Sequence, residues 1–181
     1  MTKAEKTKPA FQRPKKWFPK KDYDRTKKIK IFGMSTSNGK MLSFVVPMNI
    51  TGEVFASYVT KKIGPFLRKS FPSKTTFRVL LDGEKIMHSP PAKAALQQFK
   101  INVLPSWPAN SPDLNPQENV WGHLDDDLRL REEEQGDFRF EDFGKHCLAV
   151  VRAYQTPEKL IPGMPKRIKK CIERQGAAIG K

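Results

Sequence analysis

Residues 107–121 have the sequence Trp-Pro-Ala-Asn-Ser-Pro-Asp-Leu-Asn-Pro-Gln-Glu-Asn-Val-Trp. Three prolines within this stretch forbid a helix before the last of them, Pro116, because proline lacks the backbone N–H that a helix interior needs. Asn115 is a good helix N-cap, and Glu118 falls at the third helical position, where a capping box places its acid. The stretch therefore predicts an irregular loop that becomes a helix at Pro116. The buried side of that helix is expected at Val120, Trp121, Leu124 and Leu128.

The sequence on both sides of this stretch predicts an α/β order. Lys30–Met34 and Met41–Val46 are two strands, and Ser37–Lys40 between them forms a hairpin turn with an Asn-Gly centre. Gly52 to about Lys69 is a helix, with Phe55, Val59, Ile63 and Phe66 or Leu67 on one face. The later expected elements are a strand at Thr75–Leu81, a helix capped by Ser89 that continues to Phe99, a strand at Ile101–Leu104, and helices at Phe140–Tyr154 and Pro165–Gln175. Helices that alternate with strands indicate parallel pairing beside the hairpin.

The stretch WPANSPDLNPQENVWG resembles the signature of mariner-superfamily DDE transposases. Three other segments are similar to parts of the same family: IFGMSTSNGKMLSFVV, VLLDG and GMPKRIKKCIERQG. The resemblance covers the chain from about residue 29 to the C-terminus. It implies an incomplete RNase H-like α/β fold made of a hairpin, a helix, a strand, a helix, a strand and C-terminal helices. In that family, carboxylates hold two magnesium ions for strand cleavage and joining.

The resemblance assigns Asp82 to the second catalytic carboxylate and Glu118 to the third. The two are separated by 35 residues, close to the spacing usual in the family, and His88 lies one place later than the family's histidine. The first catalytic aspartate has no counterpart, because the only acids shortly before the hairpin, Asp22 and Asp24, lie in a lysine-rich segment. Two carboxylates hold a metal pair poorly. Asp82 and Glu118 are therefore expected to be vestigial and weak metal candidates, with no cofactor unless the protein is catalytic with Mg²⁺.

The resemblance also implies a gap in the sheet. In an RNase H-like fold the strand with the first aspartate lies between the hairpin and the strand expected at Thr75–Leu81. Its absence leaves two rows of unpaired backbone groups. Three outcomes are open: the hairpin closes onto the next strand, the N-terminal segment fills the place, or a partner completes the sheet.

Basic residues are concentrated at the two ends of the chain. The protein has 181 residues with 34 Lys+Arg and 19 Asp+Glu, a net charge of +15. Residues 1–30 hold 12 basic and three acidic residues, and residues 157–181 hold seven and two, which leaves +1 for residues 31–156. We expect a basic extension at 1–28, an RNase H-like transposase-derived domain at 29–156, and a basic C-terminal helix at 157–181.

Clustered cations select polyphosphate partners, and aromatic side chains among them can stack on unpaired bases. The expected nucleic-acid-binding residues are Lys15, Lys16, Trp17, Phe18, Lys20, Lys21, Arg25, Lys27 and Lys28 near the N-terminus, and Lys166, Arg167, Lys169 and Lys170 near the C-terminus.

Composition excludes other classes of protein. No apolar run approaches the roughly 18 residues of a membrane span. Cys147 and Cys171 are too few for a disulfide scaffold and indicate reduced core residues of an intracellular protein. The first functional hypothesis is a catalytically inactive, transposase-derived nucleic-acid-binding protein. RNA is favoured and DNA is possible as the ligand.

The most natural setting for this first hypothesis is a structural role beside other proteins in a ribonucleoprotein, such as a mitochondrial ribosome. One alternative is a fragment of a divergent mariner-type DNA transposase, which would act in the nucleus with Mg²⁺. The other is a DNA-binding regulator derived from a transposase.

Overall fold

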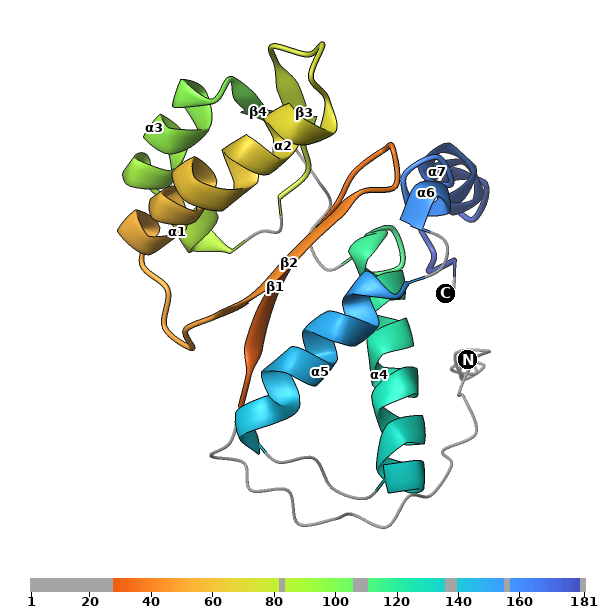
Figure 1. Ribbon diagram of the computed structural model, residues 1–181. Helices are drawn as coiled ribbons and strands as arrows, with labels where there is room; N and C mark the ends of the chain where they lie inside the picture. The colour runs from red at the N-terminus through yellow and green to blue at the C-terminus, as the bar shows by residue number, and fades with distance from the viewer. Residues whose placement is uncertain (1–27, 82–83, 106–110, 136–139, 155–156, 180–181) are drawn as a thin grey trace, which may run out of the picture.

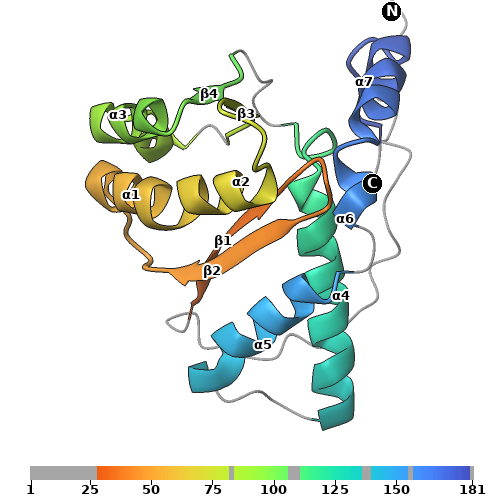
Figure 2. The same cartoon turned by 45° about the horizontal axis from the view of Figure 1, so that its top comes forward.

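The structure is a computed structural model that describes residues 28–81, 84–105, 111–135, 140–154 and 157–179. A β-hairpin runs through the middle of the molecule (Figure 1). Helices α1 to α3 and a second pair of strands lie on one side of the hairpin, and α4 and α5 lie on the other (Figure 2). The two helical groups thus cover the hairpin from opposite sides.

The hairpin consists of β1 (Lys30–Ser35) and β2 (Met41–Val46), paired antiparallel from Lys30↔Val46 to Ser35↔Met41. Gly39 in the turn has φ +78°, a conformation that glycine adopts without the steric cost of a Cβ. The Asn38 amide Nδ2 donates to the carbonyl of Ser70 at 2.9 Å. The predicted Asn-Gly hairpin is confirmed, and its turn is fixed to the end of the following helix.

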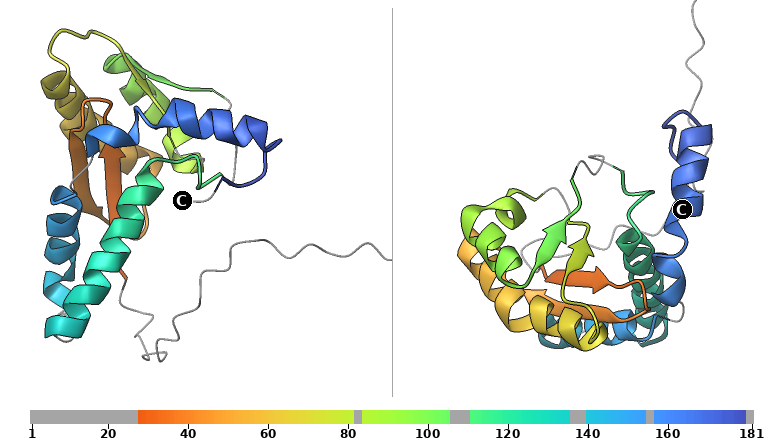
Figure 3. Two further views of the ribbon diagram at one scale, coloured as in Figure 1. Left: turned by 90° about the vertical axis from the view of Figure 1, so that its right-hand side faces the viewer. Right: turned by 90° about the horizontal axis from the view of Figure 1, so that it is seen from above.

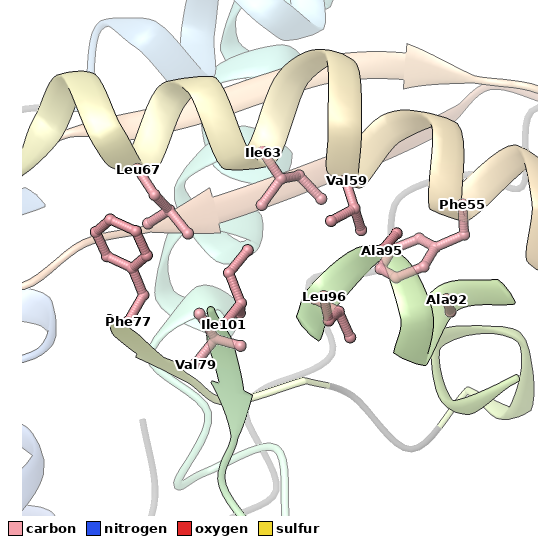
Figure 4. Close-up of a cluster of buried hydrophobic side chains, with 10 residues drawn as sticks. All are labelled: Phe55, Val59, Ile63, Leu67, Phe77, Val79, Ala92, Ala95, Leu96 and Ile101. Atoms are coloured by element: carbon pink, nitrogen blue, oxygen red, sulfur yellow. The ribbon is translucent and has the colours of Figure 1, made fainter. Parts of the chain in front are cut away.

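The helix predicted at 52–69 is present but contains a wider turn. It consists of α1 (Gly52–Tyr58), a π-helical turn η1 (Val59–Ile63) and α2 (Gly64–Ser70). Its buried residues Phe55, Val59, Ile63 and Leu67 are spaced by four, whereas an α-helix has about 3.6 residues per turn. A π turn holds more residues than an α turn, so the wider turn keeps this stripe facing the core (Figure 4).

The first core lies between this helix and a β-α-β unit. β3 (Phe77–Val79) and β4 (Ile101–Val103) pair in parallel, and η2 (Lys85–His88) and α3 (Pro90–Gln98) connect them. The predicted parallel pairing is confirmed, but β3 is shorter than Thr75–Leu81, because its partner β4 has only three residues. Ser89 takes the N-cap position of α3 as predicted, yet its hydroxyl donates to the carbonyl of Ile86 at 2.8 Å instead of capping the helix.

The four described strands form two separate two-stranded sheets, β1–β2 and β3–β4. Within the described ranges, no backbone hydrogen bond joins β1 to β3. The outcome in which the hairpin closes onto the next strand is therefore wrong. The two sheets instead share a core through side chains, since Phe32 and Met34 of β1 pack against the cluster that contains Val79.

The second core lies between the hairpin and the C-terminal helices. These are α4 (Gln117–Gln135), α5 (Phe140–Arg152), α6 (Pro157–Leu160) and α7 (Met164–Glu173). Val120, Val151 and Leu160 are buried there, with Trp121 and Leu124 packed against them, so the predicted inner face of α4 is confirmed at these positions. The helix predicted at Pro165–Gln175 is confirmed as α7, whereas the short helix α6 before it was not predicted.

The two cysteines have different environments. Cys147 is buried, and burial raises the pKa of its thiol, in agreement with its predicted place in the core. Cys171 is half-exposed on α7, so its predicted core position is wrong. Among the described residues, none of the helices has both the length and the hydropathy of a membrane span.

Gly33→Ala is expected to lower the free energy of unfolding by about 1–3 kcal/mol, because a Cβ there overpacks the contact between β1 and α4. That Cβ would lie 2.5 Å from Trp121 Cη2 and 2.8 Å from Gln117 Nε2. Gly122→Ala is the matched control, since no atom lies within 4 Å of its added Cβ. The control is expected to be neutral or to stabilise by up to about 1 kcal/mol. Urea unfolding of the two variants measures both values, and equal stabilities would contradict this packing.

Candidate nucleic-acid interface

The loop at 111–116 turns directly into α4, as the sequence predicts. The backbone N–H groups of Leu114 and Asn115 donate to the carbonyls of Ser111 and Pro112, each at 3.2 Å. The side-chain Oδ1 of Asn115 accepts from the backbone N–H of Gln117 at 3.0 Å, which confirms Asn115 as the cap. Glu118 lies in the first turn of α4, after this cap, and is half-exposed.

The beginning of α4 is held against the hairpin. The Ser35 hydroxyl of β1 donates to Gln117 Oε1 at 2.8 Å, and Trp121 packs over Gly33. Gln117 Nε2 is buried and has no hydrogen-bond partner among the described residues. The half-exposed Glu118 is thus fixed next to β1 through its neighbour Gln117.

The second carboxylate, Asp82, lies outside the described residues, and so does Trp107. In the part of the chain that the structure describes, no three His, Cys, Asp or Glu side chains come together as a possible metal site. Glu118 alone offers too few oxygen ligands for the magnesium pair that the resemblance implies. Of the two carboxylates that the resemblance assigns, the structure describes only Glu118, so no metal-dependent step follows from the described residues.

The C-terminal segment folds back onto the proline-rich loop. The Asp113 carboxylate Oδ2 accepts from the backbone N–H of Ile179 at 2.9 Å, and the Ile179 side chain is buried. Arg167 of α7 donates to Asn119 Oδ1 at 3.1 Å, next to Glu118. Two contacts therefore fix α7 and the segment after it beside the start of α4.

The predicted loop before Pro116 is present, but the contact of Asp113 in this loop with Ile179 was missed. The two residues are 66 positions apart, and no local pattern marks such a pair. Arg167 was expected to bind nucleic acid. Its guanidinium is half-buried and contacts Asn119, which positions α7, and binding of nucleic acid by Arg167 stays a prediction.

The other cations of α7 are exposed. Lys166, Lys169 and Lys170 of α7 lie on one side with Arg174, the C-cap of the helix, and Glu173 lies among them. Within the described ranges, no carboxylate forms an ion pair with any of these four. Ile168 and Ile172 on the other side are 39% and 72% exposed, and α7 has no buried residue. Figure 3 shows α7 projecting from the rest of the fold, where its cations can reach a large partner.

Most of the expected N-terminal binding residues lie outside the described residues. This holds for Lys15, Lys16, Trp17, Phe18, Lys20, Lys21, Arg25 and Lys27. Lys28 is described, and it is exposed just before β1. The part of the candidate interface in segment 1–28 therefore rests on the sequence alone. The part on α7 rests on the exposed position of its cations in the structure.

Asp113→Ala is expected to release the C-terminal segment while leaving the fold intact. A hydrogen bond to a charged acceptor contributes about 1.5–3 kcal/mol, so exchange of the Ile179 amide should accelerate about 10- to 100-fold. Hydrogen exchange followed by NMR measures this rate. Asp113→Asn keeps an acceptor oxygen and is the matched control, with a smaller acceleration. Unchanged exchange in the alanine variant would contradict the contact.

Comparisons with known proteins agree with the resemblance to DDE transposases. The family described as DDE superfamily endonuclease matches residues 2–138, a range that includes most of the basic segment 1–28. The transposable element Tc3 transposase of Caenorhabditis elegans is 31% identical over 96 residues, which are 53% of this chain and 28% of that protein. This chain thus spans less than a third of the length of this curated relative.

Two solved structures of a transposase domain share the fold. The Mos1 transposase catalytic domain with raltegravir and manganese has a TM-score of 0.67 at 20% identity. The aligned region covers 86% of this chain and 79% of the Mos1 chain. The crystal structure of the catalytic domain of Mos1 mariner transposase has a TM-score of 0.60 at 21% identity. Here the aligned region covers 83% of this chain and 75% of the Mos1 chain. These likenesses confirm the predicted incomplete RNase H-like α/β fold.

Proposed function

Because the chain belongs to the DDE superfamily endonuclease family, as a mariner-type transposase fragment, we propose that it binds the phosphate backbone of nucleic acid and does not cut strands by itself. The observation that supports binding most directly is the set of exposed cations on α7, fixed beside the family signature by Asp113 and Asn119. The proposal of inactivity rests on the missing counterpart of the first aspartate in the sequence.

Duplex DNA is the first candidate ligand. The Tc3 relative is the transposase of a transposable element, the Mos1 structures are of a transposase catalytic domain, and this chain resembles both. Each phosphate that a Lys or Arg neutralises releases condensed counterion, so such binding depends steeply on salt. An α-helix that carries four exposed cations suits a backbone contact that is independent of base sequence.

A structural role in a ribonucleoprotein, for example a mitochondrial ribosome, is the second candidate. One observation favours it: segment 1–28 places Phe11, Trp17, Phe18 and Tyr23 among its cations. Aromatic side chains stack on unpaired bases, which RNA loops expose more often than duplex DNA does. In this role the protein contacts RNA and neighbouring proteins. A third candidate, a longer transposase with strand-transfer activity, requires a first carboxylate that residues 29–181 do not supply at the expected place.

Replacing Lys166, Lys169, Lys170 and Arg174 by Gln is expected to flatten the salt dependence of duplex DNA binding. The log–log slope should become less steep by about 3, because each phosphate contact contributes about −0.9. Fluorescence anisotropy between low and physiological salt measures the slope. In the matched control, four cations of α4 and α5 are replaced by Gln. These are Arg129, Arg131, Lys145 and Arg152, and their replacement should change the slope by less than about 1. A wild-type protein without salt-dependent binding would contradict the proposed function.

A further inference from the structure

We propose that the outward face of the helix at 52–70 is a second phosphate-binding surface that takes the backbone of duplex DNA. This surface, the basic ridge, consists of Lys61, Lys62, Arg68 and Lys69. The inference rests on the proposed nucleic-acid binding and adds a contact on an element distinct from α7 and from segment 1–28.

The charge of the body is divided between its two halves. Residues 51–104 hold nine basic and three acidic residues, a net charge of +6, whereas residues 105–156 hold five and eleven, a net charge of −6. The first stretch forms α1 to α3 with β3 and β4, and the second forms α4 and α5, on opposite sides of the hairpin (Figures 1 and 2). A polyanion is therefore attracted to one side of the molecule and repelled from the other.

The helix directs its apolar residues and its cations to different sides. Figure 4 shows Phe55, Val59, Ile63 and Leu67 pointing from the helix toward α3 and the strands β3 and β4. All four ridge cations are exposed, and Pro65 between them is exposed as well. The ridge is thus a continuous outer face rather than a set of scattered lysines.

Aromatic rings, not carboxylates, hold two of the ridge cations. Lys62 Nζ lies 3.9 Å from the ring centroid of Phe44, and Arg68 Cζ lies 4.7 Å from that of Phe99. A ring face attracts a cation without adding a negative charge, so both contacts orient the side chains and leave the ridge positive. Gly64 permits the contact of Arg68 with Phe99, because a Cβ at position 64 would clash with the Phe99 ring.

No acid of the described residues neutralises the ridge. Of the acids in 51–104 that the structure describes, Glu53 lies in the first turn of α1, more than one turn before Lys61. The other, Glu84, pairs with Lys30 at 3.3 Å. Within the described ranges, no ion pair involves Lys61, Lys62, Arg68 or Lys69. The ridge therefore keeps its charge for an external partner.

The dimensions of the ridge suit a nucleic-acid backbone. Lys62 and Lys69 are seven residues apart, which is about 10 Å along a helix at 1.5 Å per residue. One DNA strand carries a phosphate about every 3.4 Å of duplex axis, so the ridge spans about three phosphates. A rigid helix keeps the cations at this spacing, which favours a regular duplex over a flexible acidic peptide.

The test is a salt titration of duplex DNA binding by the full chain and by its quadruple variant Lys61→Gln, Lys62→Gln, Arg68→Gln, Lys69→Gln. With about three phosphate contacts of about −0.9 each, the log–log slope should become less steep by about 3. The matched control is the α4–α5 variant with Arg129, Arg131, Lys145 and Arg152 replaced by Gln, which removes the same charge from the other side. If the quadruple variant does not fold, Lys61→Gln with Lys69→Gln retains both ring contacts and should shift the slope by about half as much.

The outcomes separate this inference from the proposed function. A ridge variant with the wild-type slope, beside an α7 variant with a flatter one, would overturn the ridge and leave nucleic-acid binding standing. A wild-type protein that binds RNA but no duplex DNA would overturn the ridge alone, whereas one that binds neither would contradict the proposed function itself. A ridge variant that keeps its slope but loses self-association in sedimentation would overturn the inference and assign the ridge to the acidic side of a second copy.

Discussion

Deletion of residues 1–28 is expected to produce the largest change in nucleic-acid binding. Residues 1–28 supply 11 of the 34 basic residues. If about six of these cations contact single-stranded RNA at about −0.7 each, they contribute −4 to −5 to the log–log slope. The truncated chain should lose this contribution and retain the slope of α7 and the basic ridge.

The measurement is a salt titration of the full and truncated chains on the same RNA, repeated on duplex DNA. Trp17→Ala with Phe18→Ala is the matched variant, because it removes stacking but no charge. It should weaken RNA binding by about 1–3 kcal/mol per stacked base and leave the slope nearly unchanged. Equal slopes for the full and truncated chains would show that the nucleic-acid surface lies on the folded body alone.

Phe55→Ala is expected to lower the free energy of unfolding by about 3–5 kcal/mol. The Phe55 side chain is 1% exposed and lies 6.5 Å, between ring centroids, from Phe32 of β1. It thus joins the long helix to the hairpin in a fold whose two sheets share no backbone hydrogen bond among the described residues. Because native domains are stable by only about 5–15 kcal/mol, this loss is a large part of the total.

Urea unfolding followed by circular dichroism measures this effect. Lys61→Ala on the exposed side of the same helix is the control, and its stability should stay within about 0.5 kcal/mol of the wild type. Phe55→Leu keeps most of the buried volume, so its free energy of unfolding should lie between those of Phe55→Ala and Lys61→Ala. A loss below about 1 kcal/mol for Phe55→Ala would mean that the helix and the hairpin are not joined through this core.

Local patterns in the sequence predicted most elements of the fold. The Asn-Gly turn and the four-residue spacing of Phe55, Val59, Ile63 and Leu67 depend on neighbouring residues, and both are confirmed. The ends of elements were less predictable, because they depend on partners. Leu80 and Leu81 continue the apolar run after β3, yet β4 ends at Val103 and offers them no further pairing.

The candidate site could be predicted only in part. The proline-rich stretch identified the start of α4 and its cap at Asn115, because capping is a local interaction. The contact of Asp113 with Ile179 and that of Arg167 with Asn119 join distant segments, and no sequence pattern marks them. The basic ridge was missed for a different reason: the net charge of +1 over residues 31–156 averages two stretches of opposite sign.

The central claim is that this chain binds nucleic acid without cutting it. The most direct test incubates the full chain with labelled duplex DNA and with RNA in Mg²⁺ and follows binding and strand integrity in the same samples. We predict salt-sensitive binding and no cleavage above that of the Asp82→Ala, Glu118→Ala variant. Magnesium-dependent nicking by the wild-type chain that either substitution abolishes would contradict the account and establish a working catalytic site.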